Sequence, residues 1–311
     1  MTHDLPNPAN PLKIGTRGSP LALAQAHEVR QRLALAHDLP EAAFAVVVIK
    51  VTGDLVQDRS LKAIGGKGLF TREIEDALLA GDIDIAVHSM KDMPVLQPDG
   101  LILDCHLPRE DVRDAFVSPA GGTLMDLAQG AVVGSSSLRR RAQVLLRRPD
   151  LRLVEFRGNV QTRMRKLNEG VAAATFLAMA GLNRLGMQVG QLPVEPEVML
   201  PAVAQGAIGV ERRVADARVA TMLAAIHHHD TGLRMTAERA FLTRLDGSCE
   251  TPIAGLALLQ DGGLWLRGEI LRPDGSASVT GELRGTAQDG VALGEALADD
   301  LLGRAGPGFF G

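Results

Sequence analysis

The chain has 311 residues, more than a single hydrophobic core usually organises, so we expect two or three domains. Hydrophobic residues make up 46% and charged residues 23% of the sequence, which excludes a disordered chain and favours a soluble globular protein. The formal net charge is -4, no stretch approaches the roughly 18 consecutive apolar residues of a membrane span, and the N-terminal sequence has no export signal, so we expect a cytoplasmic protein without a membrane partner.

The first hundred residues alternate between short apolar strands and helices. A strand over 12–17 leads into a helix for which Ser19 is the N-cap and Pro20 the first residue. A second strand over 44–52 and a helix over 69–80 follow, and a third strand over 82–89 is almost continuous in Ile, Ala and Val. Strands of this kind, buried on both faces, are typical of parallel sheets that helices cover.

After residue 108 the same alternation begins again, with three strand and helix pairs over 131–186. A different pattern follows in the last third of the chain. Alternating segments over 253–260, 264–271 and 276–285 predict a three-stranded antiparallel sheet, with helices at about 231–245 and 288–304. We therefore predict an α/β fold of two α/β domains, with parallel or mixed sheets, and a small α+β C-terminal domain. The expected division is 1–107 with about 208–224, then 108–207, then 225–311.

Polar clusters stand at the ends of three predicted strands, over 16–19, 88–92 and 134–140. In open parallel sheets, ligands bind beyond the carboxyl ends of the strands, where helix N-termini offer backbone N–H groups. Serines in these clusters also serve as ordinary helix caps, which is the plainer interpretation of each cluster taken alone. Because three clusters coincide, we favour a common cleft that binds a ligand.

Positive charge is concentrated between Arg139 and Arg184. This segment contains ten arginines and one lysine but only three acidic residues. Its local net charge is therefore +8, in a chain that is acidic overall. A solvated basic face is one explanation. RNA is another, but aromatic residues are only 3% of the sequence and tyrosine is absent, so the stacking platforms of nucleic-acid binders are missing. A small polyanion therefore fits better than nucleic acid.

Eight motifs in order resemble the porphobilinogen deaminase family, also called hydroxymethylbilane synthase. They are TRGSPLALAQA, GGKGLFTREIE, DIAVHSMKDMP, GSSSLRRRAQ, FRGNVQTR, AGLNRLG, AVAQGAIGVE and TAERAFLTRLDGSCETPIAG, within residues 12–285. The sequence departs from the usual family pattern at Ser135, where Thr is common, at Ala204, where Gly is usual, and in GSCETP, where GGCQVP is frequent. None of these departures removes a charged or nucleophilic group.

The resemblance implies a transferase that condenses four porphobilinogen units into linear hydroxymethylbilane, with release of ammonia, in tetrapyrrole biosynthesis. It also implies α/β lobes like those of periplasmic binding proteins. The chain would grow on a covalent dipyrromethane cofactor, held by a thioether to Cys249. The sequence DGSCETP around Cys249 reads as an exposed loop where an electrophile can reach the sulfur. Cys105 lies inside an apolar stretch and reads as a buried small hydrophobic residue.

The motif matches assign residues to three roles. Asp92 would be the catalytic residue, a fixed negative charge beside the pyrrole nitrogens that stabilises the cationic azafulvene left by loss of ammonia. Besides Cys249, cofactor binding falls to Ser89, Lys91, Ser136, Ser137, Arg139 and Arg140. Substrate binding falls to Arg17, Ser19, Lys67, Phe70, Arg157, Arg163 and Arg184. Five arginines are left as ordinary surface charges, namely Arg141, Arg147, Arg148, Arg152 and Arg165.

Some interpretations stay open at this point. His88 is more readily a satisfied histidine at a strand end than a proton carrier. Phe70 is as readily a core anchor as a substrate contact, and residues 52–68, rich in glycine, predict a mobile lid. The run of three histidines at 227–229 reads as a helix end, so we expect no metal. A noncatalytic module that clamps a small acid is the main alternative to the enzyme, and we expect a monomer.

Overall fold

The computed structural model describes residues 5–51, 71–247 and 251–310. The chain forms two compact units. The first comprises Met1–Glu110 and Ala207–Gly232, and the second comprises Asp111–Gly206 and Leu233–Gly311. Because the second unit contains two sheets, the separate third domain expected from residue 225 stays a prediction.

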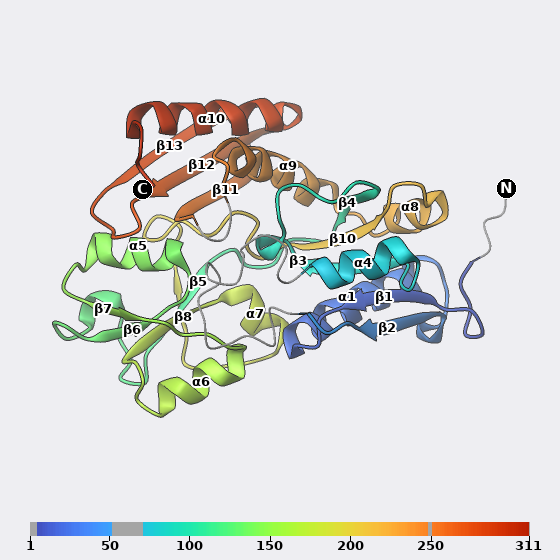
Figure 1. The fold of residues 1–311 in the computed structure, drawn as a ribbon, viewed down its shortest axis with the longest axis horizontal. Coiled ribbons are helices and arrows are strands. Elements are labelled where there is room, and N and C mark those ends of the chain that lie inside the picture. The colour runs from blue at the N-terminus through green and yellow to red at the C-terminus, as the bar shows by residue number, and fades with distance from the viewer. Residues whose placement is uncertain (1–4, 52–70, 248–250, 311) are drawn as a thin grey trace. The chain divides into compact units, whose positions relative to one another are not determined.

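A five-stranded mixed sheet forms the centre of the first unit (Figure 1). Its strands, in spatial order, are β2 (Phe44–Val48), β1 (Leu12–Thr16), β3 (Ile85–Ser89), β10 (Ile208–Arg213) and β4 (Leu101–His106). Strand β1 is parallel to β2 and β3, whereas β10 is antiparallel to both of its neighbours. The chain thus returns to its first sheet after about a hundred residues and places β10 beside β3.

Helices cover both faces of this sheet. They are α1 (Pro20–Ala36), α4 (Arg72–Ala80) and α8 (Ala217–Ala224). Helices α1 and α8 share one apolar cluster with Val87, while α4 shares another with Ala86. Since successive side chains of a strand point to opposite faces, α1 and α8 cover one face of β3 and α4 covers the other. Cys105 lies in the first of these clusters, 2% exposed, as expected.

The second unit contains another five-stranded mixed sheet. Its strands, in spatial order, are β7 (Arg152–Val154), β6 (Val132–Gly134), β8 (Ala174–Ala178), β5 (Asp114–Val117) and β9 (Leu192–Val194). Strand β6 is parallel to β7 and β8, and β5 is antiparallel to β8 and β9. The helices that follow its strands are α5 (Leu138–Arg147), α6 (Val160–Asn168) and α7 (Met179–Arg184). This sheet was predicted in part, because sequence patterning indicated β6, β7 and β8 but neither β5 nor β9.

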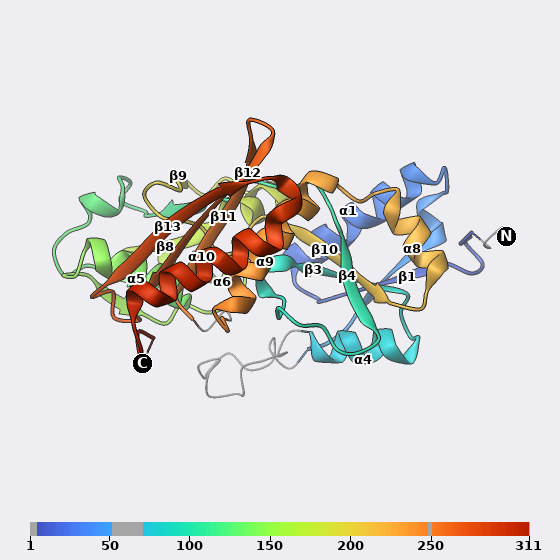
Figure 2. The ribbon, with the colours of Figure 1, turned by 90° about the horizontal axis from the view of Figure 1, so that it is seen from above.

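The three-stranded antiparallel sheet is confirmed. It consists of β11 (Ile253–Gln260), β12 (Gly263–Leu271) and β13 (Ser278–Gly285). Helix α10 (Gly290–Ala305) runs along β12 and β13 (Figures 1 and 2). Helix α9 (His229–Arg244) packs the ring of Phe241 against Gly268 of β12. A Cβ on Gly268 would lie 2.6 Å from that ring, so only glycine fits beneath Phe241. With two α/β sheets and this smaller sheet, the predicted fold class is confirmed.

Four short 3₁₀ helices complete the regular structure of the described residues. They are η1 (Glu41–Ala43), η2 (Met90–Asp92), η3 (Leu124–Asp126) and η4 (Ala287–Asp289). Of these, η2 follows β3 directly and carries Asp92.

A buried carboxylate joins α9 to two other segments of the second unit. Glu238 is fully buried, and it accepts hydrogen bonds from the backbone N–H of Ala204 at 2.6 Å and of Ala257 on β11 at 2.7 Å. Ala204, where the family usually has glycine, adopts a φ of 61°, in the left-handed region that most residues avoid. The hydrogen bond from its N–H to Glu238 holds the backbone of Ala204 in this conformation.

Glu238→Ala should therefore destabilise the protein. It leaves two buried N–H groups without an acceptor, each worth about 1–3 kcal/mol, so we expect a loss of about 2–4 kcal/mol in the free energy of unfolding. Urea unfolding measures this difference. Glu295→Ala on the exposed side of α10 is the matched control and should stay within about 0.5 kcal/mol of the parent. Equal stability of the two variants would contradict the structural role of Glu238.

Candidate active site

A small polar pocket lies in the first unit, where β1 and β3 end. It is lined by Arg17, Ser19, Leu21, Ala22, Gln25, Thr71, Val87, His88, Ser89, Asp92 and Met93. Four residues that the sequence assigned to a site meet here, namely Arg17, Ser19, Ser89 and Asp92. The pocket volume is ≈ 70 Å³. Ligand pockets usually offer about 300 Å³ or more, so this one fits a single charged or polar group rather than a whole multi-ring ligand.

The start of α1 forms one side of the pocket. Ser19 is the N-cap of α1, and its hydroxyl accepts a hydrogen bond from the backbone N–H of Ala22 at 3.2 Å. Pro20 begins the helix, where its missing N–H is harmless. The N-terminus of a helix attracts negative charge, so Arg17 and the first turn of α1 together favour an anionic group in this pocket.

The end of β3 forms the opposite side. Ser89 and Gln25 of α1 bond to each other in both directions, with Gln25 Nε2 donating to Ser89 Oγ at 2.8 Å. Three residues later Asp92 is exposed on η2 and lines the pocket. Lys91 does not line the pocket, so its predicted contact with the cofactor stays a prediction. Gln25 was missed by sequence reasoning, although a single polar residue within the apolar stretch PLALAQA is the signal that could have found it.

Next to the pocket lies a buried histidine–glutamate pair that sequence reasoning also missed. His88 Nε2 lies 3.1 Å from Glu211 Oε2, with side-chain exposures of 4% and 0%. Glu75 of α4 is 7% exposed nearby. Its burial, and secondarily the negative charge of Glu211, raise the pKa of the Glu75 carboxyl above its ordinary value. Glu211 and Glu75 carried no motif in the sequence, since single glutamates within a strand or helix usually face solvent.

The second unit contains a different charged cluster, centred on Asp114 at the start of β5. Asp114 is fully buried and accepts hydrogen bonds from Arg139 at 2.8 and 3.1 Å, and from Arg140 at 3.1 and 2.8 Å. Burial alone would raise the pKa of this carboxyl, but the guanidinium groups of Arg139 and Arg140 hold the pKa well below its ordinary range. Arg139 and Arg140 are themselves only 4% and 5% exposed.

The serines before α5 serve the backbone. Ser137 is the N-cap of α5, and its hydroxyl accepts from the N–H of Arg140 at 3.4 Å. Ser136 Oγ accepts from the N–H of Phe156 at 2.8 Å. These bonds fit the plainer interpretation of the serine cluster, and the predicted cofactor contacts of Ser136 and Ser137 stay predictions.

The remaining arginines of the +8 segment differ in their surroundings. Arg141 and Arg165 pair with Glu155 and Glu169, and Arg152 is exposed, in keeping with ordinary surface charges. Arg147 donates to the backbone oxygen of Gln143 at 3.0 Å. Arg148 was expected to be an ordinary surface charge too, but its side chain is only 13% exposed, pairs with Asp150 and donates to the backbone oxygens of Leu124, Met125 and Leu127. Arg163 and Arg184, predicted to bind substrate, bond to the backbone oxygens of Gly158 and Gly206 at 2.9 and 3.0 Å. Those two and Arg157 are half-buried, and their predicted contacts with substrate stay predictions.

Several sequence predictions lie outside the described residues. These are the cofactor attachment at Cys249, the substrate contacts of Lys67 and Phe70, and the lid over 52–68. Within the part of the chain that the structure describes, no helix is long and apolar enough to cross a membrane, and no group of three or more His, Cys, Asp or Glu side chains could hold a metal ion.

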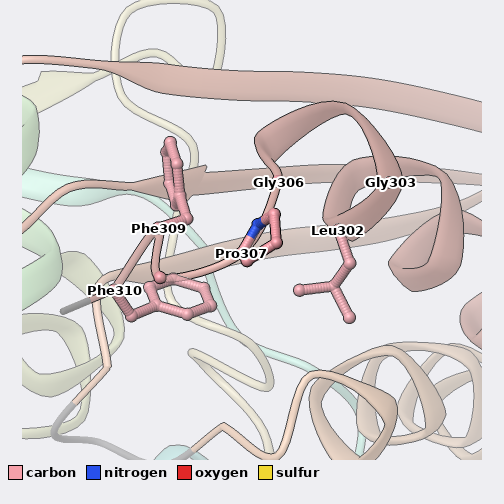
Figure 3. A pocket seen from close by; sticks show the side chains of 7 residues that line it. Leu302, Gly303, Gly306, Pro307, Phe309 and Phe310 are labelled. Atoms are coloured by element: carbon pink, nitrogen blue, oxygen red, sulfur yellow. The ribbon is translucent and has the colours of Figure 1, made fainter.

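A second pocket, larger than the one beside Asp92, lies at the end of α10 in the second unit. Its volume is ≈ 580 Å³, and Figure 3 shows Leu302, Pro307, Phe309 and Phe310 around it. The residues that line it are glycine, proline or apolar, without a charged or titratable side chain among those described. It therefore offers none of the groups that acid–base or anion-binding chemistry requires.

Comparison with known proteins decides the family. The model "Porphobilinogen deaminase, dipyromethane cofactor binding domain" matches residues 12–221, and "Porphobilinogen deaminase, C-terminal domain" matches residues 232–303. The porphobilinogen deaminase of Paracoccus denitrificans (strain Pd 1222) is 69% identical over 307 residues, covering 98% of each chain. The chain belongs to the porphobilinogen deaminase family. The chloroplastic porphobilinogen deaminase of Pisum sativum is 53% identical, over 96% of this chain and 83% of that protein.

Likeness to solved structures is weaker than the family match. The periplasmic aliphatic sulphonate binding protein SsuA from Escherichia coli superposes with a TM-score of 0.41 at 16% identity, over 75% of this chain and 69% of that one. A likeness at this level carries no argument about ligand or activity. Membership of the porphobilinogen deaminase family rests on the sequence matches.

For a porphobilinogen deaminase, the cluster around Asp114 raises a specific question. The motif assigned Arg139 and Arg140 to the carboxylates of the dipyrromethane cofactor, whereas the structure directs both guanidinium groups to a carboxylate of the protein. Arg139 also donates to Gln143 Oε1 and to the backbone oxygen of Leu200. The two arginines thus stabilise the fold of the second unit, and their role toward the cofactor stays a prediction.

Arg139→Leu separates these two roles. The change removes two charged hydrogen bonds to the buried carboxylate of Asp114, which keeps Arg140, and leaves the buried Gln143 Oε1 without its donor, so we expect a loss of about 3 kcal/mol in the free energy of unfolding. Arg141→Leu, which removes a partly exposed arginine two positions along, should cost about 0–1 kcal/mol. Urea unfolding gives the stability and intact mass gives the cofactor content. A variant of unchanged stability that lacks the cofactor would support direct binding of the cofactor and contradict the structural role.

Proposed function

We propose that the chain is hydroxymethylbilane synthase, a transferase that condenses four porphobilinogen molecules into linear hydroxymethylbilane and releases ammonia at each step. The primer is a dipyrromethane joined to Cys249 by a thioether, and the product serves tetrapyrrole biosynthesis. High identity to the porphobilinogen deaminase of Paracoccus denitrificans supports this proposal. The observation that carries it is the pocket in which Arg17 and Asp92 stand together at the start of a helix.

The pocket has the chemistry to hold a pyrrole that carries acid side chains. The carboxylate of Asp92 accepts N–H hydrogen bonds, and Arg17 with the first turn of α1 attracts carboxylates. In keeping with the small volume of the pocket, the residues present fit single groups of dipyrromethane and porphobilinogen, namely a ring N–H or a side-chain carboxylate. When bound, dipyrromethane supplies the pyrrole carbon to which the first substrate ring is joined.

Asp92 has the central electrostatic role. Loss of ammonia from the aminomethyl group of porphobilinogen leaves a cationic azafulvene, and a fixed carboxylate stabilises the positive charge where it develops. Its position on η2, directly after the buried β3, holds the carboxylate at the edge of the pocket. Ser89, tied to Gln25, fixes the backbone at the start of this turn.

Arginines supply the binding of substrate and product carboxylates. Each ring brings two carboxylates, so the elongating product gains negative charge with each addition. Arginine suits this task because its guanidinium stays charged at any working pH and matches carboxylates with two hydrogen bonds. By motif, Arg17, Arg157, Arg163 and Arg184 are the residues proposed for it, with Ser19, Lys67 and Phe70 as further substrate contacts.

The proposal extends to the setting of the enzyme. We place it in the cytoplasm as a monomer that uses porphobilinogen and binds neither nucleic acid nor membranes. The acidic net charge and the scarcity of aromatic residues support the exclusion of nucleic acid. The alternative, a noncatalytic small-anion binding protein, is not favoured, since the whole chain matches a family of enzymes with a cofactor-binding domain.

Mass spectrometry and a turnover assay together test the proposal. The purified protein should carry an adduct of dipyrromethane mass, and peptide mapping should place it on Cys249. Incubation with porphobilinogen should release ammonia and give a product that absorbs visible light after oxidation. A protein that carries the adduct and leaves porphobilinogen unchanged would overturn the activity, and an adduct on another residue would overturn the attachment site.

A further inference from the structure

His88 and Glu211 face each other on one side of the first sheet. In the antiparallel register of β3 and β10, Glu211 pairs with Ala86 and Gly209 pairs with His88, which places both side chains on the face that α4 covers. A Cβ on Gly209 would collide with the side chains of Met90 and Leu103, so this layer is crowded. The contact between His88 Nε2 and Glu211 Oε2, at 3.1 Å, is thus fixed by both strands.

The ionisable groups packed around this contact come from three elements. They are His88 on β3, Glu211 on β10 and Glu75 on α4, with Asp92 and Arg17 in the lining of the adjacent pocket. Burying two carboxyl groups beside one imidazole is unfavourable, and Glu211 Oε1 has no hydrogen-bond partner among the described residues. Buried ionisable groups beside a polar pocket are more typical of functional sites than of the packed core.

The role proposed below requires one tautomer of this pair. A Glu211 carboxylate only accepts hydrogen bonds, so in that tautomer Nε2 of His88 carries the hydrogen and donates it to Glu211. In the neutral imidazole, Nδ1 is then the basic atom. Among the described residues none forms a hydrogen bond with Nδ1, and His88 belongs to the lining of the pocket that contains Asp92.

We propose that His88 is the catalytic base that takes up, on Nδ1, the proton leaving the pyrrole α-carbon when two rings are joined. The inference rests on the proposed function and adds a second residue to Asp92. The new carbon–carbon bond makes the attacking ring cationic. Its C–H bond then breaks, the electron pair restores the aromatic ring, and the proton moves to Nδ1. Imidazolium paired with the Glu211 carboxylate later returns the proton to the released ammonia, which leaves as ammonium.

His88→Gln is the variant that tests the base. Glutamine can still donate a hydrogen bond to Glu211 but cannot take up a proton, so kcat should fall by roughly 10²-fold or more while KM stays within about threefold. With substrate deuterated at its free α-carbon, a primary isotope effect on kcat should appear or increase, because removal of that proton becomes limiting. His106→Gln, a histidine of similar burial outside the pocket, is the control and should keep kcat within about twofold.

A measurement independent of turnover examines the geometry. In full-length protein with ¹⁵N-labelled histidine, NMR should show the His88 ring protonated at Nε2 and unprotonated at Nδ1. Glu211→Gln should keep that tautomer, because its amide oxygen can still accept from Nε2. The opposite tautomer in the parent protein would overturn the proposal, since Nδ1 would then hold a hydrogen already.

Failure of this inference is distinguishable from failure of the proposed function. If the parent protein does not consume porphobilinogen, the function itself is wrong. If the parent is active and His88→Gln retains kcat within tenfold, with full cofactor content and no isotope effect, then His88 is a structural residue. A variant that loses stability but keeps turnover per cofactor-loaded molecule leads to the same conclusion.

Discussion

Cys249→Ser should yield a folded protein that carries no dipyrromethane and shows no turnover of porphobilinogen. Thiolate sulfur is a strong nucleophile toward the cationic carbon that forms the thioether, whereas a serine hydroxyl is a poor one at neutral pH. Without the thioether anchor the protein holds no dipyrromethane, so there is no primer to which porphobilinogen units can be added. Intact mass reports the missing adduct, circular dichroism reports the fold, and product absorbance after oxidation reports turnover.

The second cysteine provides the control for this prediction. Cys105 is 2% exposed, and burial, with the nearby charge of Asp104, raises the pKa of its thiol to about 12. It therefore stays protonated and unreactive at neutral pH. Cys105→Ser should retain the adduct and the activity, with a modest loss of stability from placing a hydroxyl in an apolar cluster. An adduct that persists in Cys249→Ser, or that disappears in Cys105→Ser, would contradict the attachment at Cys249.

Local patterning was enough to predict the elements that pair with close neighbours in the sequence. The segments predicted over 253–260 and 264–271 correspond to β11 and β12, because strict alternation and a Gly-rich turn specify a hairpin locally. The start of α1 was predicted for a similar reason, since Ser19 and Pro20 act within the first helical turn.

Pairing between distant segments could not be read from patterning. Strand β5 has four residues and begins with a buried aspartate, so it shows no alternation, and its three apolar residues are too short a run to predict a strand. Its pairing with β8 and β9 depends on contacts that form only in the folded unit. The same holds for Asp114 itself, whose partners lie 25 and 26 residues away in sequence. The +8 segment therefore looked more available to ligands than the structure shows.

In the candidate site, too, the residues marked by local motifs were predicted, whereas a partner from a distant segment was not. Arg17, Ser19, Ser89 and Asp92 were predicted because each lies at a strand end or helix start that short motifs mark. His88 belongs to the same motif, yet its partner Glu211 is 123 residues further along the chain. Sequence reasoning had only a histidine at a strand end, for which a structural role is the ordinary interpretation. The pairing of β3 with β10 supplies what was missing, a buried acid that orients the ring.

Asp92→Asn should leave the fold intact and reduce turnover by roughly 10²–10³-fold. Asparagine keeps the size and the hydrogen-bonding capacity of the side chain but removes the negative charge that opposes the developing cation. Because Asp92 is exposed on η2, the free energy of unfolding should change by no more than about 0.5 kcal/mol. The cofactor should remain attachable, at least in part, so turnover is measured per cofactor-loaded molecule, with the loaded fraction taken from intact mass.

Asp99→Asn is the matched control, because Asp99 is also exposed and lies outside the pocket. It removes the same charge from the same unit, so a general effect of net charge on attraction of the substrate would appear in both variants. Stabilisation of the transition state by a fixed carboxylate would lower kcat only in Asp92→Asn. A loss smaller than tenfold in Asp92→Asn, or an equal loss in both, would reassign Asp92 to a structural or steering role. It would also shift the electrostatic task to other groups of the site, because a cationic intermediate still requires negative charge or strong acceptors beside it.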